Sequence, residues 1–151
     1  MRLAKYLVAL LVAVGLSTSA WSQSNQDLGA VLTNALRPAG TVTTQQLTNT
    51  NNKGVACRFV QTASSGSPST TFAIQTYDTA TNSYVSVVTS GAITDTTPTE
   101  ITAYPNATLT TTPSGWVLNA VPLGLFWRVT QTIAGSSGPA TTSRIGCRLF
   151  N

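Results

Sequence analysis

The two cysteines are the first residues in this chain whose type and spacing suggest chemistry. Cys57 and Cys147 stand 90 positions apart, and the chain has no further cysteine and no histidine. An even cysteine count is typical of a disulfide if the chain enters an oxidising compartment, whereas free cysteine is also a common small core residue. The sequence leaves both interpretations open. Two cysteines without histidine do not make the ligand set of a zinc site, so we predict no bound metal.

Side chains that support catalysis are scarce. Beyond the first 20 residues the chain has one lysine, Lys53, and its only four acids are Asp27, Asp78, Asp95 and Glu100. The acids are scattered, so no spacing pairs two carboxylates for acid–base catalysis. No serine stands in a G-x-S-x-G turn. We therefore predict that the protein is not an enzyme and binds no cofactor.

Four arginines form the candidate partner-binding surface. Arg58, Arg128, Arg144 and Arg148 alternate with apolar residues, which directs them outward if their segments are strands. A hairpin that turns near residue 137 would put Arg128, Arg144 and Arg148 on one face. Such a face would suit an anionic partner. The competing interpretation is a solvated face that blunts pairing at strand edges.

The same alternation predicts which residues face the core. Cys57 and Cys147 share the side opposite the arginines with four apolar neighbours. These neighbours are Val55, Phe59, Ile145 and Leu149. Both cysteines are thus expected on inward faces, where a disulfide spanning the two sheets of a sandwich would lie.

Turn sequences punctuate the chain from residue 55 onward. They are SSGSP (64–68), DTATN (78–82), TDTTP (94–98), TTPSG (111–115) and GSSGP (135–139). Charged residues make up 8% of the chain, against about 25% in an average globular protein, which argues against a coiled coil. Short alternating runs between turns predict an all-β fold. We expect a single antiparallel β-sandwich, Ig-like or jelly-roll-like, of about 7–8 strands.

The first 20 residues have the three-part pattern of a secretory signal peptide. A basic start is followed by the apolar run Tyr6–Leu16 and by small residues up to a cleavage point after Ala20. The run is shorter than the roughly 20 apolar residues of a transmembrane helix, although an uncleaved anchor is the alternative. We predict export to the periplasm, medium or cell surface and no membrane span in the mature chain. Its six bases and four acids give too little net charge to predict nucleic-acid binding.

Between the signal peptide and the sandwich lies a polar segment. We assign residues 21–53 to this segment and residues 54–151 to the β-sandwich domain. The polar segment is expected to hold a short helix within residues 27–36, ended by Pro38, and a first strand over residues 41–47. The helix is suggested by four leucine and valine positions with helical spacing. They are Leu28, Val31, Leu32 and Leu36.

The sequence contains a short internal repeat. Residues 58–62 (RFVQT) and 128–132 (RVTQT) each precede a Ser/Gly/Pro turn, and each turn leads to a Thr-Thr pair. Two similar strand–loop–strand hairpins are expected, about 70 residues apart, which is too few copies for a solenoid. Chance similarity between threonine-rich strands is the alternative.

The aromatic residues divide into two groups. Trp116 and Trp127 lie in apolar strand patterns and are expected in the core. Tyr77, Tyr84 and Tyr104 border turns, and tyrosine is favoured at interfaces. We interpret the three tyrosines as candidate surface anchors for a partner.

Several short motifs, in their order and spacing, resemble a known group of proteins. They are Asn51-Asn52-Lys53-Gly54-Val55, Gly66-x-Pro68-x-x-Thr71-Phe72-x-Ile74-Gln75, Thr89-Ser90-Gly91-Ala92-Ile93-Thr94, Tyr104-Pro105, Trp127-Arg128-Val129 and Ile145-Gly146-Cys147-x-Leu149. Over residues 41–151 the chain resembles small β-sandwich virion structural proteins of tailed bacteriophages. The resemblance implies a non-enzymatic subunit or decoration module that acts through assembly. Because those proteins usually lack an export signal, it points here to an exported or prophage-derived relative.

Two functions follow as expectations. The first is a structural or assembly protein, of phage virion type or an exported relative, that associates with itself or with other structural proteins. The second is a secreted or periplasmic adhesin-like domain that recognises a glycan or an anionic surface through its arginines.

Overall fold

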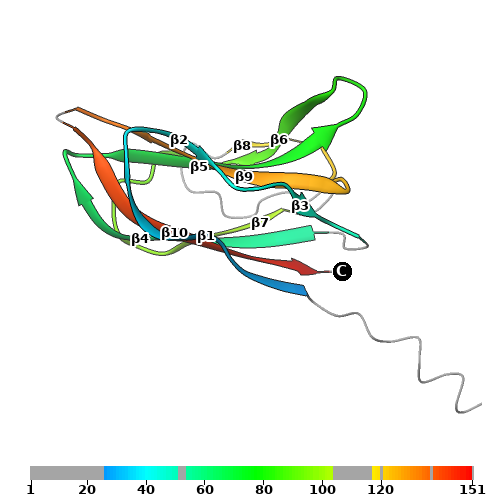
Figure 1. Ribbon diagram of the computed structural model, residues 1–151, viewed down its shortest axis with the longest axis horizontal. Coiled ribbons are helices and arrows are strands. Elements are labelled where there is room, and N and C mark those ends of the chain that lie inside the picture. The colour runs from blue at the N-terminus through cyan, green and yellow to red at the C-terminus, as the bar shows by residue number, and fades with distance from the viewer. Residues whose placement is uncertain (1–25, 51–53, 104–116, 120, 137, 151) are drawn as a thin grey trace, which may run out of the picture.

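Strands are the only regular secondary structure in the described part of the protein. The computed structural model describes residues 26–50, 54–103, 117–119, 121–136 and 138–150. The strands in this part are β1 (Gln26–Pro38), β2 (Gly40–Thr43), β3 (Leu47–Thr48), β4 (Gly54–Ser65), β5 (Ser69–Asp78), β6 (Ser83–Thr89), β7 (Thr99–Ala103), β8 (Val117–Leu118), β9 (Phe126–Ala134) and β10 (Ala140–Phe150). They form two antiparallel sheets that lie face to face (Figure 1). The predicted all-β sandwich is therefore confirmed.

The strand order is that of a jelly roll. Sheet A has the order β1-β10-β4-β7, and sheet B has the order β2-β9-β5-β6-β8, with β3 also beside β9. Leaving out the two-residue strands β3 and β8, successive strands alternate between the sheets except at β5–β6, which pair in one sheet. Eight strands in two such sheets are the jelly-roll arrangement. The Ig-like alternative is wrong.

The alternating sequence pattern fixes which side chains face between the sheets. Along β10, residues at every second position are buried, from Thr141 to Leu149. On β4, Val55, Cys57 and Phe59 are buried with them. Side chains of sheet B, including the predicted core residue Trp127, complete the interior. The inward parity predicted from sequence is thus confirmed.

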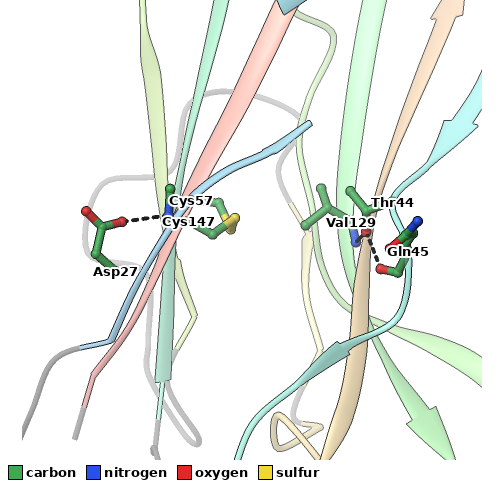
Figure 2. Close-up of a disulfide and its surroundings, with 7 residues drawn as sticks. Asp27, Thr44, Gln45, Cys57, Val129 and Cys147 are labelled. Atoms are coloured by element: carbon green, nitrogen blue, oxygen red, sulfur yellow. Dashed lines mark hydrogen bonds between the residues drawn. A yellow bond between two sulfur atoms is a disulfide. The ribbon is translucent and has the colours of Figure 1, made fainter. Parts of the chain in front are cut away.

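A disulfide joins the two inner strands of sheet A. Cys57 on β4 and Cys147 on β10 are direct register partners, with their Cα atoms 4.1 Å apart. Figure 2 shows both sulfurs on the inner side of the sheet, turned toward Val129 of sheet B. From the sequence we expected the bond to span the two sheets of the sandwich, and this expectation is wrong. Strands β4 and β10 are neighbours in one sheet, so the inward cysteines meet side by side.

The N-terminal segment differs from the prediction. Residues 26–38 form β1 and not a helix. Its pairing with β10 is interrupted by three register shifts, one of them beside Gly29, whose φ is +63°. Such bulges add residues to one strand, so Leu28, Val31 and Leu32 reach the core without a period of two. The strand predicted over 41–47 is divided between β2 and β3, and the predicted signal peptide lies outside the described residues.

A buried arginine compensates for the irregular β1 ladder. Arg37 is only 7% exposed. Its guanidinium donates to the carbonyl oxygens of Thr33 (2.5 Å), Ala35 (2.9 Å) and Ser143 (2.6 Å). These carbonyls belong to the stretch where the register shifts. Burial lowers the pKa of Arg37, but an arginine side chain remains protonated in proteins. Arg37 therefore stabilises the bulged edge with charge-assisted hydrogen bonds.

The internal repeat corresponds to two arches between the sheets. Residues 58–62 lie on β4, which leads from sheet A to β5 in sheet B, and residues 128–132 lie on β9, which leads from sheet B to β10 in sheet A. Strand β4 pairs with β10, and β5 pairs with β9. The two hairpins expected from the sequence are wrong, because neither arch pairs its own two strands. The two arches run in opposite directions between the same sheets.

The glutamines of the two repeat copies lie at the polar end of the interior. Gln61 and Gln131 are 1% and 0% exposed. Gln131 exchanges hydrogen bonds with the Ser143 hydroxyl at 2.8 and 3.0 Å, and Gln61 accepts one from Thr70 at 3.4 Å. Ser143 is also the register partner of Gln61 across sheet A. Ser143 thus connects the arches, sheet A and the Arg37 side chain.

Replacing both cysteines by serine should lower the stability of the fold. The disulfide closes a loop with a sequence separation of 90, and removal of such a link costs about 2–5 kcal/mol. Urea unfolding of the wild type and the double variant measures this difference. The oxidised and reduced wild type provide the matched comparison. Equal unfolding midpoints for the oxidised wild type, the reduced wild type and the double variant would contradict the assigned role of the bond.

Ser143→Ala should destabilise the protein by about 1–3 kcal/mol, because buried groups of Gln131 and Arg37 lose a partner. Thr142→Ala is the control, since its side chain is directed to the other face of the same strand. Thermal unfolding of both variants measures the difference. If both variants had the melting temperature of the wild type, the buried polar cluster would not stabilise the fold as described.

Candidate functional site

Three of the four arginines of the predicted partner-binding surface lie together. Arg58 on β4 and Arg144 and Arg148 on β10 are exposed on the outer face of sheet A. Arg128 lies on β9 in sheet B, so it faces the opposite side of the sandwich. The expectation that it shares a face with Arg144 and Arg148 is wrong. The reason is that β9 and β10 form an arch between sheets and not a hairpin.

The three arginines surround a groove, which we call the arginine groove. It encloses about 620 Å³ on the outer face of sheet A. Small residues line it between the arginines, among them Gly146 on β10, its register partner Ala30 on β1, and Ala56 on β4. A Cβ atom at Gly146 would lie 3.3 Å from the carbonyl oxygen of Gly29. Glycine at this position therefore lets the bulged strand β1 lie close to β10 and keeps the groove open.

Charges in the arginine groove are only partly balanced. Arg148 forms an ion pair with Glu100 at 3.0 Å, and the two side chains are 61% and 47% exposed. Asp27 accepts a hydrogen bond from the backbone N–H of Gly29 at 2.8 Å. Within the described residues, the guanidinium groups of Arg58 and Arg144 make no hydrogen bond or ion pair. These two planar donor groups are available for a carboxylate or phosphate, which arginine binds in a bidentate manner.

The position of the groove excludes one simple explanation for its arginines. Basic residues often protect an exposed sheet edge from pairing with another chain. Strands β10 and β4, however, are the two inner strands of sheet A, between β1 and β7. Arg58, Arg144 and Arg148 therefore do not blunt an edge.

A second cluster occupies the outer face of sheet B. The guanidinium carbon of Arg128 lies 3.8 Å from the centre of the Tyr84 ring, and Tyr77 meets Tyr84 edge to face with centroids 5.2 Å apart. We call these three residues the tyrosine–arginine platform. Sequence reasoning singled out all three residues separately but did not join them. Tyr104, the third candidate anchor, and Trp116 lie outside the described residues.

Hydrogen bonds hold each member of the platform. Arg128 donates through Nε to Gln75 at 2.8 Å, and the Tyr84 hydroxyl donates to Gln46 at 2.8 Å. The Tyr77 hydroxyl donates to the side chain of Asn82. Gln46 lies between β2 and β3, far from Tyr84 in sequence, so the platform depends on the folded sheet.

The β5–β6 turn beside the platform is organised by Asp78. Its carboxylate accepts hydrogen bonds from the Thr81 hydroxyl at 2.8 Å and from the Ala80 backbone N–H at 2.9 Å. The Thr81 hydrogen bond and then the Ala80 hydrogen bond lower the pKa of Asp78. The turn contact is therefore formed above the ordinary pKa of aspartate, and it is lost only as the pH falls through the lower pKa of the folded state.

Comparison with known proteins identifies no relative: no family model matches the chain, and no curated protein matches its sequence. In the part of the chain that the structure describes, no helix has the length and apolar character needed to cross a membrane. Across the same residues, no group of three or more His, Cys, Asp or Glu side chains is placed to hold a metal ion.

Substitution of the exposed arginines and of the buried Arg37 should have different effects on the stability of the fold. Arg58→Gln and Arg144→Gln should each change the free energy of unfolding by less than about 0.5 kcal/mol, because both side chains are exposed and have no partner among the described residues. Arg37→Met should cost about 1–3 kcal/mol, because it leaves carbonyl oxygens unsatisfied. Urea titrations measure all three. A large loss for Arg58→Gln or Arg144→Gln would show that these residues support the fold.

Proposed function

We propose that this protein is an exported, non-enzymatic structural module that attaches to a larger assembly through the arginine groove. The partner is another structural protein, or a second copy of the chain, that presents acidic side chains. The observation that carries the proposal is the pair of guanidinium groups of Arg58 and Arg144, which have no partner among the described residues and lie in an open groove of about 620 Å³.

The disulfide supports export. Cys57 and Cys147 are bonded, and structural disulfides persist in oxidising compartments outside the cytosol. The signal-peptide pattern of residues 1–20 agrees with that environment. Together they favour the periplasm, the medium or the cell surface as the place where the module works.

The fold and the sequence resemblance support an assembly role by analogy. Jelly rolls serve as viral capsid domains as well as lectin domains, although a fold alone does not assign a function. The resemblance to small phage structural proteins rests in part on Trp127-Arg128-Val129 and Ile145-Gly146-Cys147. We accordingly favour a virion-type structural or decoration module, or its prophage-derived exported relative.

Fractionation of a native culture on a density gradient tests this proposal. Wild-type protein should sediment with large particles, and raising the salt concentration should release it because exposed charge pairs are screened. The Arg58→Gln/Arg144→Gln double variant should move to the free fraction.

Arg128→Gln provides the charge control, since it removes one positive charge from the opposite face and should sediment as the wild type does. A wild-type protein that is strictly monomeric and never found with particles would contradict the proposal. Unchanged sedimentation of the double variant would exclude the groove as the attachment site.

A further inference from the structure

We propose that the tyrosine–arginine platform on sheet B is a saccharide-binding site that takes pyranose rings of an oligosaccharide chain. The platform comprises Tyr77, Tyr84 and Arg128, and it lies on the opposite face of the sandwich from the arginine groove. The inference is independent of the proposed assembly function.

The aromatic part of the platform suits the apolar face of a sugar ring. Tyr77 and Tyr84 are only partly buried, and their ring centroids lie 5.2 Å apart at an interplanar angle of 65°. Tyrosine offers a rigid apolar ring with a polar end, and it gives a large contact area at a low cost in conformational entropy. The C–H groups on one face of a pyranose ring pack on such a surface, while its hydroxyls point to the sides.

Arg128 supplies directed hydrogen-bond donors at the same place. Its guanidinium is oriented by the Nε bond to Gln75 and by stacking on Tyr84. Within the described residues, no hydrogen bond or ion pair occupies its terminal amino groups. These amino groups can donate to two neighbouring sugar hydroxyls, or to the two oxygens of a uronate carboxylate.

The platform is fixed before a ligand arrives. Gln46 accepts from the Tyr84 hydroxyl, and Asn82 accepts from the Tyr77 hydroxyl. The Asp78 turn in turn holds the hairpin that carries Asn82. Because these side chains are already ordered, binding costs less conformational entropy than it would on a mobile surface.

The charge of this face favours a saccharide over a nucleic acid. Among the described residues, Arg128 is the one cation on the strands of sheet B. Nucleic-acid binding depends on several cations that neutralise successive phosphates. The same outer face carries hydroxyl groups, among them the Thr41–Thr132 pair at 3.0 Å. A hydroxyl-rich surface with aromatic rings and one arginine matches the mixed polar and apolar character of a sugar chain.

Affinity electrophoresis of the full mature chain tests the proposal. The probes are cellohexaose, chitohexaose and polygalacturonate, each coupled to or included in a native gel. We expect retardation by at least one probe. The neutral and uronate probes distinguish Arg128 donation to hydroxyls from Arg128 pairing with a carboxylate.

The variants locate the binding surface. Tyr84→Ala and Arg128→Gln should each weaken the apparent affinity by roughly tenfold, as expected for a central aromatic or arginine contact. Tyr84→Phe keeps the ring and should retain most of the affinity, which separates stacking from misfolding. Arg58→Gln is the matched control on the other face and should bind as the wild type does.

Two results would overturn the inference. One is the absence of retardation by all three probes. The other is equal retardation of the wild type, Tyr84→Ala and Arg128→Gln. Both results leave particle attachment through the arginine groove unaffected, because that attachment is measured with Arg58 and Arg144 variants.

Discussion

The pairing of β4 with β10 is the constraint on which the rest of the structure depends. Cys57 and Cys147 are register partners in this ladder, and their disulfide fixes the alignment covalently. A slip of one residue in a strand exchanges its two faces. A slip of β4 would bring Arg58 into the core and expel Phe59. The same bond that stabilises the core therefore determines which side chains form the outer surface of sheet A.

The two opposed arches explain why the protein has two different outer faces. Each arch begins with an Arg-x-x-Gln-Thr sequence, with the glutamine inside and the arginine outside. Because one arch begins in sheet A and the other in sheet B, Arg58 and Arg128 point to opposite sides of the sandwich. Arg58 joins two further arginines around small residues. Arg128 instead stacks on an aromatic ring. Repeated sequence thus leads to different surface chemistry through different neighbours.

Local periodicity predicted the parts of the structure that depend on one strand at a time. The inward positions of the cysteines and of Trp127, and the outward position of the arginines, follow from a period of two. The prediction of a helix within residues 27–36 was wrong, because bulges in β1 give apolar spacings that resemble those of a helix. The grouping of Arg128 with Arg144 failed because a turn sequence does not tell whether its strands share a sheet. The open middle at Gly146 and the contact of Tyr84 with Gln46 depend on strand order, which pattern alone does not supply.

The central claim is that the outer face of sheet A is the surface by which the module attaches. Modification of arginines with phenylglyoxal, read by peptide mass spectrometry, tests it directly on particle-bound and salt-released protein. The account predicts that Arg58 and Arg144 are protected in the bound protein and reactive after release, while Arg128 reacts equally in both states. Equal modification of Arg58 and Arg144 in the bound and released protein would contradict it.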